Sequence, residues 1–272
     1  MYLFSHILDD NLSGSGSILY KVQSELIKAG EDQEVLDSDE LLQQTEKLKR
    51  HFPLFGLLWH FLNDLKNVIK PEMKIDGRHL SDFVKEYRKK WNGAQEKACH
   101  HILKSIDFKG KKVLVHSNSS AIHTLFALLH KRHILPVVWQ TYSSPAGEGK
   151  MQAKTLSNIG FETHLVHEDT LSHFIGQMDM AIFGTDMLLE DRFVNKVGTF
   201  PIALLFDYFK KPIYVLAEQR KIFLPQDMPE LSIEEEKPVT ELIPGKTRNL
   251  RVHNLYFESV PISLVNRVFL DE

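Results

Sequence analysis

The sequence predicts an α/β protein: an amino-terminal all-helical domain, residues 1–108, followed by a doubly wound, largely parallel Rossmann-like sheet domain, residues 109–272. Up to about Phe108 the apolar residues recur every three or four positions, which is typical of amphipathic helices. From Lys111 onward, short apolar runs alternate with helical segments, as in strand–helix–strand units. The 272 residues, 43% of them hydrophobic and 25% charged, are enough for two cores.

The amino-terminal half is predicted to consist of helices, without strand alternation and without an internal repeat. Apolar residues at helical spacing form one clear face: Ile18, Val22 and Leu26. Asp37 and Asp76 each precede an apolar periodic segment, as N-cap residues do. A long helix from about residue 79 to 106 is expected to be interrupted near Asn92 and Gly93.

The second half is predicted to contain a parallel sheet with helices on both of its faces. The expected strands cover residues 113–115, 137–139, 163–166, 180–183 and 213–216. In sheets of this kind a ligand binds beyond the carboxyl ends of the strands. Residues 226–249, rich in Glu, Pro and Lys, predict a loop or poorly ordered excursion before a last strand near 255–257.

Composition argues against several classes of protein. The net charge is −3 with Lys and Arg spread along the chain, so no nucleic-acid partner is predicted. Asp9 and Asp10 interrupt the first apolar stretch and no apolar run could span a bilayer, so we expect a cytoplasmic protein without a membrane partner. The single cysteine, Cys99, and the unpatterned histidines predict no metal site. No glycine-rich turn follows a strand, so no dinucleotide or other cofactor is expected.

Polar residues follow the predicted strands at their carboxyl ends. Asp186 lies just past the strand at 180–183. After a polar crossing, Asn195 and Lys196 precede an apolar helix at 202–209, which Thr199 or Phe200 would cap. Free N–H groups at that helix start, with the Lys196 ammonium nearby, would favour a phosphate. An ordinary solvated Asp–Lys pair is the alternative for this segment alone.

Further polar groups follow the other strands. Ser117, Ser119 and Ser120 open the helix after the first strand, where their hydroxyls and amides are expected to cradle a phosphate. The other candidate ligand-binding residues are Ser144 and Lys150, in a loop expected to act as a lid or a phosphate loop, and Glu218 and Lys221, after the fifth strand. Singly, such residues are most often caps, ion pairs and turn formers. Together they predict a pocket at the carboxyl edge of the sheet.

Five segments of the chain resemble a known family. They read VLVHSNSSA, TYSSPAGEGKMQAKTL, GTDMLLEDRFVNKVGT, YVLAEQRKIF and HNLYFESVPISLVNRVF. This order resembles the family that joins the alpha, beta and delta subunits of translation initiation factor 2B to two sugar-phosphate isomerases, which act on methylthioribose 1-phosphate and ribose 1,5-bisphosphate. The segment SGSGSI, which begins with Ser13 and Gly14, resembles the loop that this family sends from its helical domain over the pocket.

The resemblance implies roles for particular residues and two departures from the enzymes. Asp186 matches the catalytic aspartate, and Ser117 stands at the position of the catalytic cysteine. A serine hydroxyl lacks the acidity of a thiol that acid–base catalysis near neutral pH requires. Ser144 and Ser13 stand where the isomerases have arginines, which hold phosphate more strongly than serine. Glu218, after Ala217, resembles the initiation-factor branch.

Three functions remain open from the sequence. The first is an initiation-factor-2B-like protein that binds a sugar or nucleotide phosphate without cysteine-dependent catalysis. The second is an active aldose–ketose isomerase of a phosphorylated pentose, in which Asp186 transfers the proton and His116 or Lys196 polarises the carbonyl. The third is a non-catalytic assembly or regulatory subunit. The resemblance implies a homodimer formed through the sheet domain, with a higher assembly as a further option.

Overall fold

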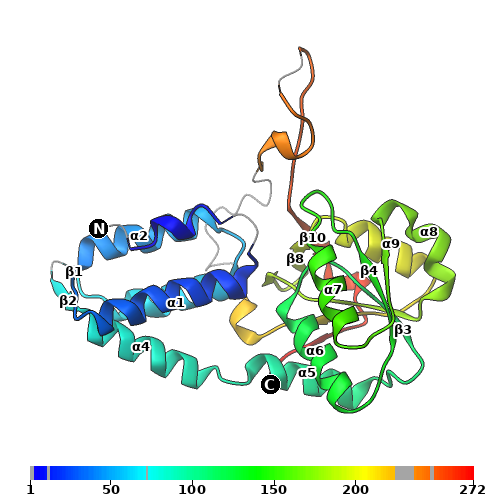
Figure 1. Ribbon diagram of the computed structural model, residues 1–272, viewed down its shortest axis with the longest axis horizontal. Helices are drawn as coiled ribbons and strands as arrows, with labels where there is room; N and C mark the ends of the chain where they lie inside the picture. Colours follow the sequence, from blue (N-terminus) through cyan, green and yellow to red (C-terminus); the bar gives the residue numbers. More distant parts are fainter. Residues whose placement is uncertain (1–2, 11–12, 72, 224–235, 246–247) are drawn as a thin grey trace. The chain divides into compact units, whose positions relative to one another are not determined.

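A computed structural model of the protein describes residues 3–10, 13–71, 73–223, 236–245 and 248–272 (Figure 1). The chain divides into two compact units, Met1–Ala94 and Gln95–Glu272. The sequence predicted the boundary at residue 108, which is one helix beyond the boundary between these two units. The reason is that α5 (Ala94–Ser105) packs into the core of the second unit through Ala98, Cys99 and Ile102.

The first unit is built mainly of helices, coloured blue to cyan in Figure 1. They are the 3₁₀-helix at Ser5–Ile7 and the α-helices α1 (Ser15–Glu31), α2 (Ser38–His51), α3 (Gly56–Val68) and α4 (Gly77–Lys90). Ile18, Val22 and Leu26 are fully buried on α1, as their spacing predicts. The break predicted near Asn92 and Gly93 lies between α4 and α5.

A short antiparallel strand pair in the first unit was not anticipated from the sequence. Strand β1 (Val35–Asp37) pairs with β2 (Lys74–Asp76), with Val35 opposite Asp76. Strands of three residues are too short to produce a recognisable alternation. Each strand ends in the predicted N-cap: the Asp37 carboxylate accepts from Asp39 N at 3.0 Å and Asp76 accepts from Arg78 N at 2.9 Å.

The second unit contains a six-stranded parallel sheet with the order β11-β9-β6-β3-β4-β5. Its strands are β3 (Lys112–Val115), β4 (Val137–Thr141), β5 (Thr163–Val166), β6 (Met180–Phe183), β9 (Ile213–Leu216) and β11 (Arg267–Phe269). The five strands predicted between residues 113 and 216 are confirmed. The strand order reverses between β3 and β6, and in doubly wound sheets this is where a ligand crevice forms.

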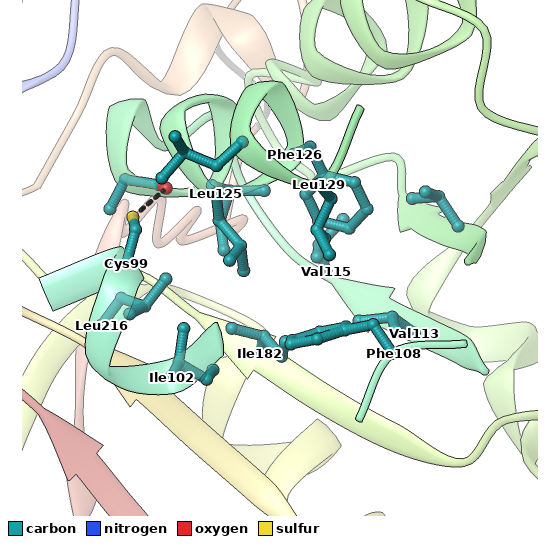
Figure 2. Packing of buried hydrophobic residues seen from close by; sticks show 14 of the residues in the cluster. Cys99, Ile102, Phe108, Val113, Val115, Leu125, Phe126, Leu129, Ile182 and Leu216 are labelled. Carbon is teal, nitrogen blue, oxygen red and sulfur yellow. Dashed lines mark hydrogen bonds between the residues drawn. The ribbon is translucent and has the colours of Figure 1, made fainter. Parts of the chain in front are cut away.

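Helices cover both faces of this sheet, as the sequence predicts. Alternate strand residues point to opposite faces. On one face Val113, Val115 and Ile182 pack against α5, α6 (Ser120–Lys131) and α7 (Gly149–Asn158), a cluster that Figure 2 shows from close by. On the other, Leu114 and Ala181 pack against α8 (Leu171–Phe174) and α9 (Thr199–Tyr208). Among the described residues of both units, no helix is long and apolar enough to cross a membrane.

A second, antiparallel sheet in this unit corrects two expectations. Its order is β10-β8-β7, with β7 (Met187–Leu188), β8 (Arg192–Lys196) and β10 (Phe257–Pro261). Asn195 and Lys196, expected in the connection between a strand and a helix, are therefore buried residues of β8, because Phe193 and Val194 extend a strand up to them. The strand expected near 255–257 is β10, which begins at Phe257, but it is not the last strand, because β11 follows it.

The excursion predicted at residues 226–249 lies partly outside the described residues. Its described part contains a 3₁₀-helix, Val239–Glu241, and Glu236 forms an isolated bridge with Leu255. The Glu241 carboxylate accepts hydrogen bonds from Asn254 Nδ2 at 2.8 Å and from the Tyr256 hydroxyl at 2.6 Å. These contacts fix Tyr256, whose ring lies against Lys196.

Candidate functional site

The turn that carries Ser117 joins β3 to α6 at the carboxyl edge of the sheet. Ser117 has a left-handed backbone (φ 67°), which a non-glycine residue adopts only when its surroundings hold it. Its N–H donates to Ser143 Oγ at 2.8 Å and its carbonyl accepts from Gln140 Nε2 at 3.1 Å. Ser119 N donates to Gln152 Oε1 at 2.9 Å. Two amides expected to cradle a phosphate are therefore bonded to protein side chains.

The Ser117 hydroxyl belongs to a row of three functional groups. It donates to Glu148 Oε1 at 3.1 Å, and Glu148 Oε2 lies 3.3 Å from the Lys196 ammonium. The exposed fraction is 15% for the Glu148 side chain and 4% for that of Lys196. Burial raises the pKa of Glu148 and lowers that of Lys196, while the attraction between the two charges opposes both shifts. The structure thus joins hydroxyl, carboxylate and ammonium from three separate elements.

Lys196 is enclosed by its neighbours. Its ammonium lies 4.1 Å from the centre of the Tyr256 ring, which places the cation against an aromatic face. Asn195, the preceding residue, donates from Nδ2 to Thr199 Oγ1 at 3.0 Å and so stabilises the start of α9. Both residues lie at the predicted edge of the sheet, although their polar atoms already have partners within the chain.

A carboxylate of the protein, that of Glu258, lies at the start of α9, where the sequence predicted a bound phosphate. Gly198 is the N-cap residue, one position before the predicted cap, and its φ of 101° suits glycine. The Glu258 carboxylate, from β10, accepts from Phe200 N at 2.7 Å and also bonds the amides of Gly198 and Thr199. The expectation of free N–H groups for a phosphate at this helix start is therefore wrong, because a carboxylate satisfies them.

His116 is a structural residue of the site. Its Nε2 donates to Val197 O at 3.0 Å, and its Nδ1 lies 2.6 Å from Thr141 Oγ1, which donates to it in the neutral ring. Burial lowers the pKa of His116 to about 4. Because both ring nitrogens are engaged and the side chain is buried, polarisation of a substrate carbonyl by His116, which the isomerase hypothesis allowed, has no support here.

Asp186 belongs to a second charged group at the same edge. Lys221 Nζ donates to Thr185 O, and the carboxylates of Asp186 and Glu218 both attract its ammonium. Burial lowers the pKa of Lys221 more strongly than these carboxylates raise it. The Glu218 carboxylate forms a buried ion pair with Arg220, and the Glu218 carbonyl oxygen accepts from Lys221 N at 2.9 Å.

The turns after β3 and β6, which carry Ser117 and Asp186, touch at the strand-order reversal. An added Cβ on Gly184, at the end of β6, would lie 2.2 Å from Ser119 Oγ, so the turn after β3 touches the turn after β6. The Asp186 amide donates to Val194 O at 2.9 Å, which ties that turn to β8, the strand of Lys196. The structure therefore brings the turns of Ser117, Asp186 and Lys196 to one edge of the sheet.

Three other predicted residues lie toward the outside of this edge. Ser120 Oγ donates to Gln95 Oε1 at 2.9 Å, and Ser144 Oγ lies 3.3 Å from His167 Nε2. Lys150 is exposed at the start of α7, where its ammonium donates to the Tyr142 hydroxyl at 3.1 Å and lies 4.8 Å from that ring. A bound anion could reach the Lys150 ammonium from solvent.

Ser13 and Gly14 belong to the first unit. Gly14 is the N-cap residue of α1, and Ser13 N donates to Asp10 Oδ1 at 2.9 Å. Lys21 Nζ also lies 3.5 Å from Ser13 Oγ. The role of these two residues in ligand binding stays a prediction.

Three carboxylates of the site were not anticipated from the sequence. Glu148 and Glu258 are described above, and Glu168 Oε1 accepts from the amides of Ser143 and Ser144. One local signal for Glu148 was present, since it stands between Gly147 and Gly149 in the loop after β4. Glu258 and Glu168 carry no such signal, because their partners are distant in sequence, at the start of α9 and in the loop after β4.

The protein is therefore an α/β protein in which a helical unit precedes a Rossmann-like sheet unit, with charged groups at the carboxyl ends of the strands. The chain matches the model of the Initiation factor 2 subunit family over residues 19–272, and it therefore belongs to that family. The ribose 1,5-bisphosphate isomerase of Archaeoglobus fulgidus is 29% identical over 166 residues, which are 60% of this chain and 53% of that protein. A putative translation initiation factor eIF-2B subunit 2-like protein of Pyrococcus abyssi is 28% identical over 163 residues, 60% of this chain and 56% of that one.

The chain thus aligns with about half the length of these curated relatives. Two solved structures share the fold. Translation initiation factor eIF-2B of Pyrococcus horikoshii OT3 has a TM-score of 0.80 and 22% identity, covering 99% of this chain and 94% of that one. The 5-methylthioribose 1-phosphate isomerase of the same organism has a TM-score of 0.74 and 19% identity, covering 99% and 82%. At these identities the likeness shows the fold alone.

Proposed function

We propose that this chain binds a small phosphorylated metabolite, a sugar or nucleotide phosphate, at the carboxyl ends of β3, β6 and β8, without thiol-dependent catalysis. The observation that carries the proposal is the row Ser117, Glu148 and Lys196, which joins three strand-end elements. Hydroxyl, carboxylate and ammonium groups together can bind the hydroxyls and the charge of such a ligand. The names of the isomerase relatives, which act on sugar phosphates, support the same ligand class.

The identity of residue 117 and the location of the chain's cysteine support the proposal that thiol chemistry is absent. The Ser117 hydroxyl donates a hydrogen bond to the Glu148 carboxylate. An alcohol is a poor acid and a poor base near neutral pH. The chain's single thiol, Cys99, is fully buried in the core between α5 and α6, where its Sγ donates to Ala121 O at 3.5 Å. A cysteine mechanism therefore has no thiol to use at this site.

Calorimetric titration of the full chain with ribose 1-phosphate, ribose 1,5-bisphosphate and nucleoside monophosphates tests the proposal. We expect saturable heat from at least one of them at or below millimolar concentration. Lys150→Gln is expected to weaken that binding about tenfold, since it removes an exposed charge-assisted donor. Lys210→Gln, a matched change at an exposed lysine of the same unit, should leave it unchanged. No heat from any ligand would remove the proposal.

The isomerase alternative makes a different prediction with the same preparations. If Asp186 transfers a proton between the carbons of a pentose phosphate, ketose appears in NMR spectra, and Asp186→Asn abolishes it. A chain that binds the ligand but yields no ketose fits the binding proposal instead. Ketose formed at an unchanged rate by Asp186→Asn would exclude Asp186 from the chemistry.

An assembly role is the second candidate, because one helix of the sheet unit is apolar on its outer side as well as its inner side. On α9, Ile202, Ala203 and Phe206 are buried, while Leu204 and Tyr208 remain 46% and 77% exposed. A helix that is apolar all round is normally covered on every side. A solved tetrameric eIF2B-beta2-delta2 complex from C. thermophilum has the same fold, with a TM-score of 0.74 and 15% identity.

The assembly candidate predicts that α9 contributes to a homodimer through the sheet unit. Val260, on β10, is fully buried, so its side chain offers no such surface. Sedimentation equilibrium is expected to give a dimer for the native chain and a monomer for Tyr208→Glu. Leu135→Glu, at a residue 52% exposed in the loop before β4, serves as the control and should remain dimeric. A monomeric native chain would rule out this candidate as stated.

A further inference from the structure

We infer that Glu148 restricts the site to ligands with a single phosphate, because its carboxylate already occupies the side of Lys196 on which a second phosphate would be held. The inference rests on the proposed function and names the charge class of its ligand. It concerns a residue that neither the sequence pattern nor the family resemblance singled out.

The contacts of Glu148 resemble those of a bound anion. One carboxylate oxygen accepts from the Ser117 hydroxyl at 3.1 Å, and the other lies 3.3 Å from the Lys196 ammonium. Tyr256 covers the same ammonium with its ring at 4.1 Å. A phosphate that approaches Lys196 therefore has to displace a carboxylate or bind beside it.

The backbone on both sides of Glu148 is packed closely against the end of β4 and the residue that follows it. Gly147 has φ of 71°, and an added Cβ there would lie 2.8 Å from the Tyr142 ring. An added Cβ on Gly149 would lie 2.0 Å from Thr141 O. Both glycines allow an approach that other residues could not make, so the loop carries the backbone of Glu148 close to the end of β4, from where its carboxylate reaches Ser117 and Lys196.

Other carboxylates near Lys196 also disfavour a second phosphate. After Glu148, the carboxylates of Glu241 and Glu168 are the next groups that attract its ammonium. A dianionic phosphate placed there would face three carboxylates for one cation, which disfavours it. A neutral sugar hydroxyl, in contrast, can donate to Glu148 and accept from Lys196 or Ser117. Such a site selects by repulsion of the wrong ligand as well as attraction of the right one.

The experiment compares the affinities of ribose 1-phosphate and ribose 1,5-bisphosphate for the full chain by calorimetry at one salt concentration. We expect the native chain to bind the monophosphate at least as tightly as the bisphosphate. Glu148→Gln keeps the shape of the side chain and removes its charge, and it is expected to shift the affinity ratio about tenfold or more toward the bisphosphate. Glu162→Gln, at a side chain 69% exposed before β5, is the matched charge control and should not shift the ratio.

The outcomes separate this inference from the proposed function. If both ligands bind and Glu148→Gln leaves their ratio unchanged, Glu148 does not select the ligand, although the binding proposal stands. If neither ligand nor any other phosphate binds to either chain, the proposed function itself fails. Should Glu148→Gln not fold, the native chain still decides, since a bisphosphate bound more than tenfold tighter than the monophosphate contradicts the inference.

Discussion

Replacing Lys196 with methionine is expected to lower the free energy of unfolding of the sheet unit by about 4 kcal/mol at pH 8. Methionine fills a similar volume, so packing changes little, but the Glu148 carboxylate loses the ammonium 3.3 Å away. A buried charge without a partner is far more costly than the pair was worth. Urea denaturation followed by circular dichroism measures the change.

Two comparisons test the physical reason for this loss. The double variant Lys196→Met with Glu148→Gln is expected to recover most of it, because no uncompensated charge remains. The loss should also be smaller at pH 5. Burial raises the pKa of Glu148 and removal of Lys196 raises it further, so more of the carboxyl is protonated there and carries no unpaired charge. Lys210→Met, at a side chain 79% exposed, should cost less than about 0.5 kcal/mol. Equal losses in the single and double variants would contradict this account.

Acidification from pH 6.5 to pH 4 is expected to remove about 3 kcal/mol of stability through His116 alone. Burial, the largest cause, and the Lys196 ammonium lower the pKa of His116 from 6.5 to about 4. The folded state therefore keeps the ring neutral where the unfolded chain binds a proton. This contribution is complete above pH 6.5 and is lost as the pH falls toward 4.

The measurement is the difference in unfolding free energy between the native chain and His116→Gln across this pH range. Glu148 and Glu258 have raised pKa values, so their protonation increases the stability of the folded state as the pH falls. The pH dependence of the native chain alone therefore mixes opposing effects, whereas the difference between the two chains isolates His116. Glu168 Oε1 lies 3.9 Å from His116 Nδ1 and is common to both chains. Parallel stability curves for the two chains would show that His116 does not titrate as described.

The strands of the parallel sheet could be predicted because their signal is local. A strand that is buried on both faces is a continuous apolar run, and β6 and β9, which are such strands, have the predicted bounds. Helix caps such as Asp37 are equally local, since the carboxylate bonds amides two and three residues away. Elements of this kind can be recognised without knowledge of the rest of the fold.

The partners of the site residues could not be predicted in the same way. Glu258 caps α9 across a sequence separation of 58 residues, and only the pairing of β10 with β8 brings it there. The sequence identified Lys196 as a cation near the strand ends, but its pairing with Glu148 depends on the folded loop after β4. For this reason the location of these residues near the strand ends was predictable, whereas the pairing of their charges was not.

The buried thiol of Cys99 makes the stability of one unit measurable inside the intact chain. It lies in the cluster shown in Figure 2, and burial raises its pKa to about 12. An alkylating reagent reacts with thiolate, so it can modify Cys99 only after this core opens. Because the first unit has no cysteine, the rate of labelling reports opening of the sheet unit alone.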